Sequence, residues 1–413
     1  MKRFYLLLFA LFLINVANAQ WTALNSGTTQ NLHAVYFPDA NTGYAVGASG
    51  TILKTGDGGA HWITLNSGTT VTLNSVFCVD DNTVYVVGQA GTIILTIDGG
   101  NIWTDLSVGG TNAFNSIIYL SFSPGIGYIV GQNGTMYYFS HSGSGGTDPT
   151  LDPTGTTNSL NSVCFSAAGY AVGGSGTILK STDLFTWTAL LSGTPYDLYS
   201  VYFPTADTGY AVGGNAAFGT IKQHQIILKT TDGGTFWYPL SSGTTIPLYS
   251  VYFTTANTGY AVGGTSSGIS QSQIIYKTID GGATWTSLSS GTNNSLLSVY
   301  FTGAKVGFAV GYGGTILKTT NGGASTAIKE NTLPKSTYTL SPNPSSGKVI
   351  IINNNPSKES TVSIFNMTGQ QMMSQKFNKQ EEMELNISQF LKGIYIVKIQ
   401  VDNEIVNKQL VIR

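Results

Sequence analysis

The residues that could do chemistry are mainly aspartates, and they recur in one tight-turn motif. The pattern [Ser/Thr]-x-Asp-x-Gly-x-x-Trp fits residues 55–62, 96–103, 230–237 and 278–285. Residues 181–187 form a shorter copy without the glycine, and 319–323 carry Asn321 where the aspartate belongs. Carboxylates can serve as general acids, bases or nucleophiles. A single catalytic centre would not need one in every copy, so we predict a structural role for this motif.

Each residue of the motif has a physical reason to be there. An aspartate can accept backbone N–H groups within its own turn, a glycine supplies a positive φ, and a tryptophan buries a large surface against the hairpin. This role is predicted for Asp57, Asp98, Asp183, Asp232 and Asp280, with Trp62, Trp103, Trp187, Trp237 and Trp285. Five lysines precede the Asp or Asn position by three residues: Lys54, Lys180, Lys229, Lys277 and Lys318. We expect these lysines to line a solvated strand edge.

Composition excludes one enzyme class. The motif resembles the Asp boxes of bacterial-neuraminidase-type repeats, and sialidases of that type bind the substrate carboxylate with arginines and use a tyrosine supported by a glutamate. Residues 20–326 contain seven lysines and thirteen aspartates but neither arginine nor glutamate. Lysine cannot supply the bidentate fork of arginine. A sialidase is therefore excluded.

A second enzyme class stays open as an alternative. Other glycosidases need only two carboxylates a few ångströms apart. Four aspartates have no assigned turn role: Asp105, Asp148, Asp152 and Asp197. If two of them faced each other across a channel mouth, they could hydrolyse a polysaccharide.

Histidines and cysteines indicate neither a metal nor a disulfide. His33, His61, His141 and His224 show no metal-binding spacing. Cys78 and Cys164 occupy adjacent strand positions in different repeats, where their side chains face opposite sides. We therefore predict no metal site, no cofactor and no disulfide.

The elements that position these residues are repeats. The segment Gly-Tyr-Ala-Val-Gly recurs seven times with small variations, and its closing glycines are 40 to 50 residues apart. Each unit reads as four short strands, A to D, with the Asp-box turn joining C to D. Repeats of this length built from strands predict propeller blades, so seven copies predict an all-β, seven-bladed β-propeller.

Two defects at the ends of the repeat array compensate for each other. The seventh unit has Thr326 where the tryptophan of strand D belongs, and Trp21 begins a strand D that no strands A to C precede. We predict that the N-terminal strand completes the last blade, which also pairs an otherwise exposed sheet edge.

The two ends of the chain differ in character from the repeats. Residues 1–19 have a basic start, a short apolar run and an Ala-Asn-Ala end, which is typical of a cleaved signal peptide. No segment approaches membrane-spanning length. Residues 327–336 read as a linker, and 337–413 as a small antiparallel β-sandwich. The formal charge is −6 (7 − 13) over 20–326 and +3 (10 − 7) over 327–413, so no whole-chain basic field recruits nucleic acid.

Two resemblances follow from these motifs. The repeat, with its Gly-Tyr-Ala-Val-Gly and Asp-Gly-Gly segments, resembles the photosystem II stability/assembly-factor family of propellers. The tail resembles the C-terminal sorting domain of type IX secretion cargo, through Ser341-Pro342-Asn343-Pro344, the segments 362–369 and 393–399, and Lys408 to Ile412. This second resemblance implies the type IX secretion machinery and its C-terminal-domain peptidase as partners. It also implies a secreted or cell-surface protein.

Loop lengths indicate a candidate binding face. The D–A and B–C connections share one end of each blade, and the fifth and sixth units lengthen their B–C connections by 215–225 and 265–273. We place 143–157, which joins the third unit to the fourth, at the same end. Candidate ligand-binding residues beside these loops are Tyr196, Asp197, Tyr199, Tyr249 and His224. The alternative for the tyrosines is packing between blades.

These features together predict non-catalytic binding of a protein or a glycan, because aromatic and amide groups suit either ligand and long loops often carry function. The alternatives are the polysaccharide hydrolase that uses an aspartate pair and an assembly factor for another envelope protein.

Overall fold

The computed structural model describes residues 20–120, 125–142, 145–146, 149–215, 224–241, 243, 245–265, 272–324, 338–353, 359–367, 369–401 and 404–413. The predicted signal peptide, the predicted linker and Asp148 lie outside these residues. Internal contacts divide the chain into two compact units, Met1–Thr326 and Ala327–Arg413. Each unit is described by itself below.

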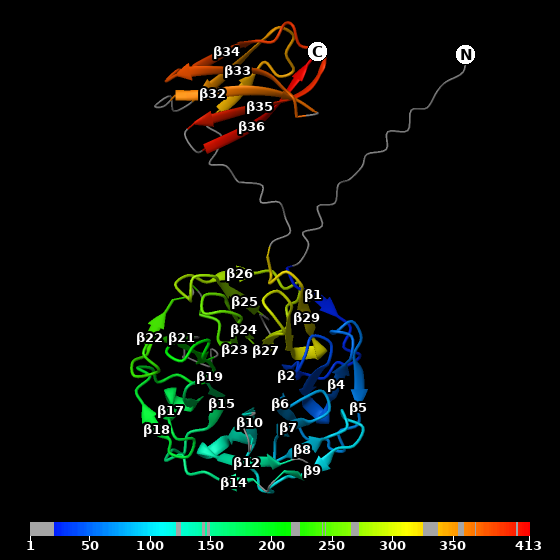
Figure 1. Cartoon of the computed structure of the whole chain (residues 1–413), viewed down its shortest axis with the longest axis vertical. Helices are drawn as coiled ribbons and strands as arrows, with labels where there is room; N and C mark the ends of the chain where they lie inside the picture. Colours follow the sequence, from blue (N-terminus) through cyan, green and yellow to red (C-terminus); the bar gives the residue numbers. More distant parts are fainter. Residues whose placement is uncertain are drawn as a thin grey trace, which may run out of the picture. The chain divides into compact units, whose positions relative to one another are not determined.

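The first unit is a ring of antiparallel sheets, which we call blades 1 to 7 in chain order (Figure 1). Blade 1 consists of β2 (Leu32–Tyr36), β3 (Gly43–Gly47), β4 (Ile52–Thr55) and β5 (Ile63–Leu65). Blade 2 consists of β6 (Leu73–Cys78), β7 (Val84–Gly88), β8 (Ile93–Thr96) and β9 (Thr104–Asp105). Blade 3 consists of β10 (Phe114–Leu120), β11 (Gly125–Gly131), β12 (Met136–Ser142), β13 (Gly145–Gly146) and β14 (Thr150–Leu151).

The remaining blades repeat this order. Blade 4 consists of β15 (Leu160–Phe165), β16 (Gly169–Gly173), β17 (Ile178–Ser181) and β18 (Thr188–Leu190). Blade 5 consists of β19 (Leu198–Tyr202), β20 (Gly209–Asn215), β21 (His224–Thr230) and β22 (Tyr238–Leu240). Blade 6 consists of β23 (Leu248–Phe253), β24 (Gly259–Thr265), β25 (Ser272–Thr278) and β26 (Thr286–Leu288). Blade 7 consists of β27 (Leu296–Phe301), β28 (Gly307–Gly311), β29 (Ile316–Thr319) and β1 (Thr22–Leu24).

The strands A form the inner wall of the ring. Each contacts the next in the order β2, β6, β10, β15, β19, β23 and β27, and β27 contacts β2 again. In the described residues the ring therefore closes with seven blades. Four B–C connections are short 3₁₀ turns: η1 (Ala48–Gly50), η2 (Gln132–Gly134), η3 (Gly174–Gly176) and η4 (Tyr312–Gly314).

The packing explains the repeated Gly-Tyr-Ala-Val-Gly segment. All five residues of β3 are buried, because both faces of this strand pack against neighbouring blades. The closing glycine has a steric reason, since a Cβ on Gly47 would lie 1.9 Å from the carbonyl oxygen of Asn31. Cores join consecutive blades, as where Val35 and Leu53 of blade 1 pack with Phe308 and Val310 of blade 7.

The N-terminal strand closes the ring, as predicted. β1 pairs with β29 in antiparallel register, with Thr22 opposite Lys318. Trp21 is completely buried. Its ring packs edge-on against Phe301 of the same blade, with centroids 5.9 Å apart, and against Tyr260 of blade 6, at 6.5 Å.

One predicted loop position is wrong. The segment 143–157 was expected to join blades 3 and 4 at the D–A end, but it contains the outer strands of blade 3. β12 pairs with β13 at its far end, through Ser142 and Gly145, and with β14 through Tyr137 and Leu151. The connection that replaces the Asp-box turn therefore lies at the opposite end of the blade, and only the residues after β14 lead into blade 4.

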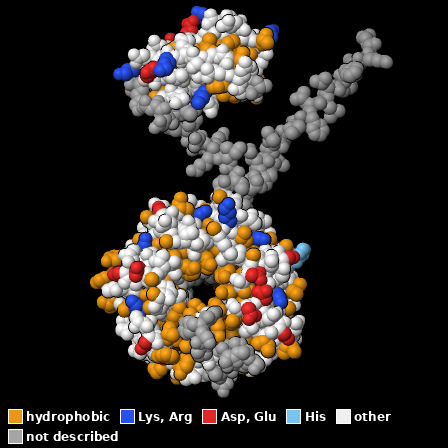
Figure 2. All heavy atoms as spheres, in the orientation of Figure 1, with side chains coloured by type: hydrophobic (Ala, Val, Ile, Leu, Met, Phe, Trp, Pro, Cys, Tyr) orange, Lys and Arg blue, Asp and Glu red, His pale blue; other side chains and the backbone are white. Residues whose placement is uncertain are grey.

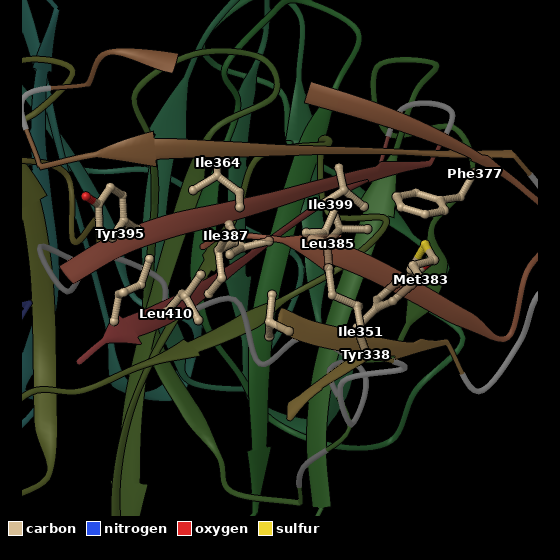
Figure 3. Packing of buried hydrophobic residues seen from close by; sticks show 14 residues of the cluster. Tyr338, Ile351, Ile364, Phe377, Met383, Leu385, Ile387, Tyr395, Ile399 and Leu410 are labelled. Carbon is tan, nitrogen blue, oxygen red and sulfur yellow. The ribbon is translucent and has the colours of Figure 1, made fainter. Parts of the chain in front are cut away.

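The second unit is a two-sheet β-sandwich. One sheet has the order β30 (Tyr338–Ser341), β31 (Lys348–Asn353) and β34 (Glu382–Asn386). The other has the order β33 (Gln371–Asn378), β32 (Glu359–Asn366), β35 (Gly393–Val401) and β36 (Glu404–Ile412). Figure 3 shows the core between the sheets, where Ile351 and Leu385 of the first sheet meet Ile364 and Ile399 of the second. All strand pairs are antiparallel, as the alternating sequence predicts.

The closure of the ring gives a stability prediction. We expect Trp21→Ala to lower the free energy of unfolding of the propeller by about 3–5 kcal/mol, because it removes a fully buried aromatic side chain and leaves a cavity. Thr22→Ala is the matched control, because Thr22 is exposed on the same strand, and we expect less than about 0.5 kcal/mol for it. Urea unfolding measures both. Equal midpoints for the two variants would contradict the closure argument.

Candidate functional site

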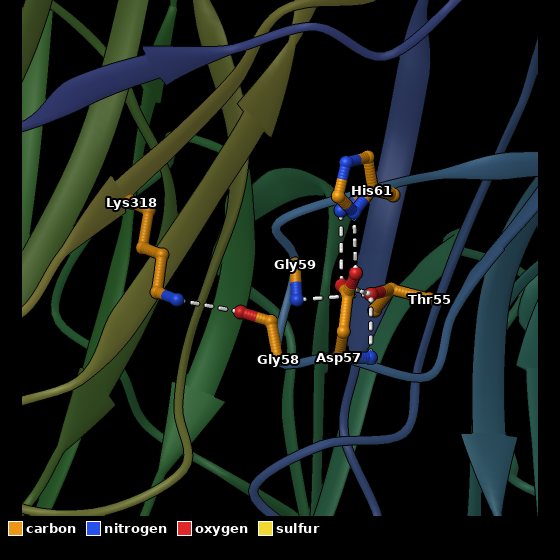
Figure 4. Close-up of polar contacts among 6 residues, drawn as sticks. All are labelled: Thr55, Asp57, Gly58, Gly59, His61 and Lys318. Atoms are coloured by element: carbon orange, nitrogen blue, oxygen red, sulfur yellow. Dashed lines mark hydrogen bonds and ion pairs between the residues drawn. The ribbon is translucent and has the colours of Figure 1, made fainter.

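The Asp-box turn of blade 1 is built from a local hydrogen-bond network (Figure 4). The Thr55 hydroxyl donates to Asp57 Oδ1 at 2.9 Å and accepts the Gly59 N–H at 2.9 Å. Asp57 Oδ1 also accepts the His61 N–H at 2.9 Å. The same pattern recurs around Asp98, Asp232 and Asp280. Each carboxylate is therefore occupied by donors of its own turn.

These donors lower the pKa of the box carboxyls. The Thr284 hydroxyl and N–H lower the pKa of Asp280 to about 2. The N–H and ring of His61, with the Thr55 hydroxyl, hold the pKa of Asp57 well below its usual range. Asn321 takes the place of the aspartate in the turn of blade 7 without a charge, because its Oδ1 accepts the Thr319 hydroxyl at 3.0 Å. A permanently ionised carboxylate that an amide can replace is a turn-forming group and a poor proton donor.

Four of the box tryptophans pack against the phenylalanine at the end of strand A, or directly after it, in their own blade. The indole of Trp62 meets Phe37 edge-on, with centroids 5.9 Å apart. Trp187, Trp237 and Trp285 meet Phe165, Phe203 and Phe253 in the same way, at 6.0, 5.9 and 6.2 Å. Trp103 is half-buried and packs with the core between blades 1 and 2.

The lysines before the boxes were predicted to be solvated, and this prediction is wrong. Each donates from Nζ to the carbonyl of the central glycine in the box of the next blade. The pairs are Lys54–Gly99, Lys180–Gly233, Lys229–Gly281, Lys277–Gly322 and Lys318–Gly58, at 2.6 to 2.8 Å. Figure 4 shows the last pair, in which blade 7 reaches blade 1. We call this contact the lysine clasp.

A tyrosine of strand B shares the same acceptor. The Tyr170 hydroxyl donates to the Gly233 carbonyl at 2.8 Å, beside Lys180. The Lys180 ammonium lies 5.7 Å from the centre of the Tyr170 ring, within the range of a cation–π contact. A carbonyl oxygen has two lone pairs, so one glycine carbonyl accepts both donors.

The aspartates without an assigned turn role do not assemble into a pair. Asp105 of blade 2 accepts the Ser107 N–H at 2.9 Å, and Asp152 of blade 3 accepts Trp187 Nε1 at 3.0 Å. Asp197, before blade 5, accepts the Ser175 N–H at 2.8 Å. Burial raises the pKa of Asp152, and the Trp187 bond opposes this. The described geometry thus gives the hydrolase alternative no support from these three residues.

One carboxyl pair does form, at the A–B turns of blades 1 and 2. A side-chain hydrogen bond with Asp39 raises the pKa of Asp81, while the Thr42 N–H lowers that of Asp39. Hydrogen-bonded carboxyls are closer than the roughly 5 Å that separates the catalytic pair of retaining glycosidases. The sequence assigned Asp81 to a turn and gave no signal of this contact.

The histidines and cysteines are dispersed. His33 Nδ1 lies 3.2 Å from Asn74 Oδ1, and His61 pairs with Asp57. The side chain of His141 lies outside the described residues, and Cys78 and Cys164 are free thiols. In the described ranges, no three His, Cys, Asp or Glu side chains gather in a way that could hold a metal ion.

The candidate binding face, which we call the loop face, consists of the D–A and B–C ends of the blades. At the second position of strand A, asparagine side chains form hydrogen bonds to the next blade, and we call this row of bonds the amide belt. Asn74, Asn115 and Asn161 donate to the carbonyls of Phe114, Leu160 and Leu198, at 2.8 to 2.9 Å. Tyr199, Tyr249 and Leu297 occupy the same position in blades 5 to 7 and interrupt this belt. Figure 2 shows that the centre of the ring is open.

The structure brings four of the predicted loop-face residues together in two ring contacts, one tilted and one stacked. Tyr199 and Tyr249 contact each other across blades 5 and 6, with ring centroids 5.3 Å apart. Tyr196 stacks on His224, at the start of β21, with centroids 4.6 Å apart. β20 and β21 extend their pairing to Asn215 and His224, so the long B–C connection begins as a hairpin. The loop tips at 216–223 and 266–271 lie outside the described residues.

Tyr312 is a loop-face residue that the sequence reasoning missed. It begins η4 in blade 7, and its N–H donates to the Ser295 carbonyl at 3.0 Å. Burial, then the phenols of Tyr199 and Tyr312, raise the pKa of Tyr249 to about 12. The signal was available, because the same position holds Ala48, Gln89, Gln132, Gly174, Gly214 and Gly264 in the other blades.

Comparison with known proteins identifies the second unit and the fold of the first. Residues 339–413 match the family described as Secretion system C-terminal sorting domain. This domain places the protein outside the cell or on its outer surface. None of the helices in the described ranges is long and apolar enough to cross a membrane.

The first unit is similar to solved propellers. The structure titled "YCF48 bound to D1 peptide" has a TM-score of 0.57 at 20% identity, covering 73% of this chain and 97% of that chain. YCF48 from Cyanidioschyzon merolae gives 0.57 at 19% identity, covering 72% and 98%. At this identity the likeness shows a shared fold. No curated protein sequence matches the chain.

The lysine clasp gives a second stability prediction. Lys180→Met should lower the free energy of unfolding by about 1–2 kcal/mol, because it removes a charged donor from a partly buried carbonyl that keeps one hydroxyl partner. Lys305→Met is the control, since Lys305 is exposed in an A–B turn, and it should cost less than about 0.5 kcal/mol. Thermal unfolding compares the two. A solvated Lys180 side chain would make both losses equal.

Proposed function

We propose that the chain is an exported, non-catalytic binding propeller whose loop face holds the ligand. Three observations support this proposal. The sorting domain takes the protein out of the cell. The first unit has the fold of propellers, a fold that also carries binding proteins. The described Asp-box carboxylates are occupied by their own turns.

The observation that carries the proposal is the asymmetry of the loop face. Blades 2 to 4 use the second position of strand A to bond the next blade through an asparagine. Blades 5 and 6 place Tyr199 and Tyr249 there, beside Tyr196 and His224. These large amphipathic side chains gather on one side of the propeller, at the two blades with the longest B–C connections. Such a cluster is typical of a recognition surface.

A second candidate is the assembly of another envelope protein through a peptide segment. The similar structure titled "YCF48 bound to D1 peptide" shows a propeller of this fold with a peptide ligand. An extended protein segment is therefore a ligand class to test beside glycans.

The role of the tail gives a prediction on localisation. Deletion of 337–413 should leave a folded propeller that accumulates in the periplasm, because the two units have separate cores. Fractionation and immunoblotting measure this. As a control, 337–413 fused to an unrelated periplasmic protein should carry it outside. If the truncated chain still reaches the medium or the cell surface, the tail is not the export signal.

The binding face is tested with matched tyrosine variants. The purified full-length protein is screened on glycan and peptide arrays, beside Tyr199→Ala with Tyr249→Ala, and beside Tyr238→Ala. Tyr238 is 56% exposed on the outer strand β22, so its loss should leave binding unchanged. We expect the double variant to lose array binding while its melting temperature stays within a few degrees. Wild-type binding that survives in the double variant would place the ligand elsewhere.

A further inference from the structure

Within the residues that the structure describes, the loop face is almost free of charge; Lys222, in the B–C connection of blade 5, lies outside them. In the described parts of the D–A and B–C connections, Asp197 is the one exposed charged side chain, and its carboxylate accepts the Ser175 N–H. The other exposed polar residues are serines, threonines, asparagines and glutamines. The charged side chains gather at the other end of the blades, in the Asp boxes, the A–B turns and the lysine clasps.

The tyrosines of this face differ from those that hold the ring together. Tyrosines of strand B each donate their hydroxyl to a backbone carbonyl of the next blade: Tyr44, Tyr128, Tyr170, Tyr210 and Tyr260. Among the described residues, the hydroxyls of Tyr199, Tyr249 and Tyr312 have no hydrogen-bond partner in the protein. These three side chains are half-buried, so packing fixes the aromatic rings while the hydroxyls stay available to a ligand.

This combination favours one ligand chemistry. A sugar ring presents C–H groups that pack on an aromatic face and hydroxyls that both donate and accept hydrogen bonds. A phenol hydroxyl also donates and accepts, and burial keeps Tyr249 neutral up to about pH 12. A charged peptide or a uronate polymer would need opposite charges in the site, since an unpaired charge is costly to bury. Arginine or lysine would have to supply them to a carboxylate.

We propose that the loop face binds a neutral polysaccharide chain, with Tyr199, Tyr249 and Tyr312 lining a sugar subsite at the channel mouth. This inference rests on the proposed binding function and adds the ligand class and Tyr312 to it. The subsite lies on blades 5, 6 and 7, where the amide belt is interrupted.

The experiment removes hydroxyls and keeps rings. Isothermal titration of the full-length protein uses four neutral probes (cellohexaose, laminarihexaose, mannohexaose and xylohexaose) and one anionic probe, polygalacturonate. We expect at least one neutral probe to bind, with an affinity that changes less than about twofold between 20 and 500 mM NaCl, because no ion pair is formed. Polygalacturonate should not bind.

The variants locate the subsite. Each of Tyr199→Phe, Tyr249→Phe and Tyr312→Phe should weaken binding by about fivefold, and the three together by about 100-fold, since each removes one hydrogen bond. Tyr170→Phe is the matched control: it removes the hydroxyl bonded to Gly233, so it should lower the melting temperature and leave the affinity unchanged.

Each other outcome overturns a stated part. If no neutral probe binds, or if binding falls steeply with salt, the ligand class is wrong. A peptide or polygalacturonate that binds and is lost in the triple variant would also overturn the ligand class, while leaving the proposed binding face in place. A neutral probe that binds the triple variant with wild-type affinity would overturn the tyrosine subsite. The proposed function itself fails only in the array experiment above.

Discussion

In five of the seven blades, the central glycine of the Asp-box turn is the residue at which the blade is fastened to the preceding one. Gly58 has a φ of 67°, which glycine adopts without strain. Its N–H donates to the Asn41 carbonyl within blade 1, and its carbonyl accepts Lys318 from blade 7. One residue therefore orders its own turn and the joint to the preceding blade. The same arrangement recurs at Gly233, Gly281 and Gly322. The joints between these blades therefore repeat one polar contact at the Asp-box end of a hydrophobic interface.

Both sides of this contact change together where the motif is lost. Blade 3 has no Asp box, and blade 2, which precedes it, has Leu95 where the lysine belongs. Blade 4 has a shortened box in which Leu184, with a φ of 76°, takes the place of the glycine. Its carbonyl accepts the Tyr128 hydroxyl at 2.7 Å, and Tyr138 of blade 3 stands where the lysine belongs and packs on Phe185 of the box. A lysine at position 95 would lack the box-glycine carbonyl of blade 3, and the buried Leu95 avoids the cost of an unpaired charge there.

The parts of the structure that could be predicted from sequence are those that local pattern determines. The seven Gly-Tyr-Ala-Val-Gly segments imply buried strands, and Trp21 with Thr326 implies closure, because each defect is visible along the chain. The lysine clasp could not be found in this way, since Lys318 and Gly58 are 260 residues apart and an isolated lysine is ordinarily solvated. The position of 143–157 was mistaken because β14 has only two residues and no tryptophan to mark it. Loop length gives no signal for Tyr312, because Gly311 and Lys318 are seven positions apart, as Gly47 and Lys54 are.

The clasp also explains why the two ends of the blades differ in chemistry. Lysines and strand-B tyrosines bond the next blade at the Asp-box end, and the box aspartates order the turn that supplies the acceptor. At the loop face the joints depend on amides and serine hydroxyls, such as Ser162 and Ser200, which accept the N–H groups of Val201 and Val251. In blades 5 and 6 the serine bonds remain while the amide is replaced by Tyr199 or Tyr249. Because the serine hydrogen bond still joins the two blades, the second position of strand A does not need an asparagine there. A propeller fastened at one end in this way can vary the side chains at its other end without opening the ring.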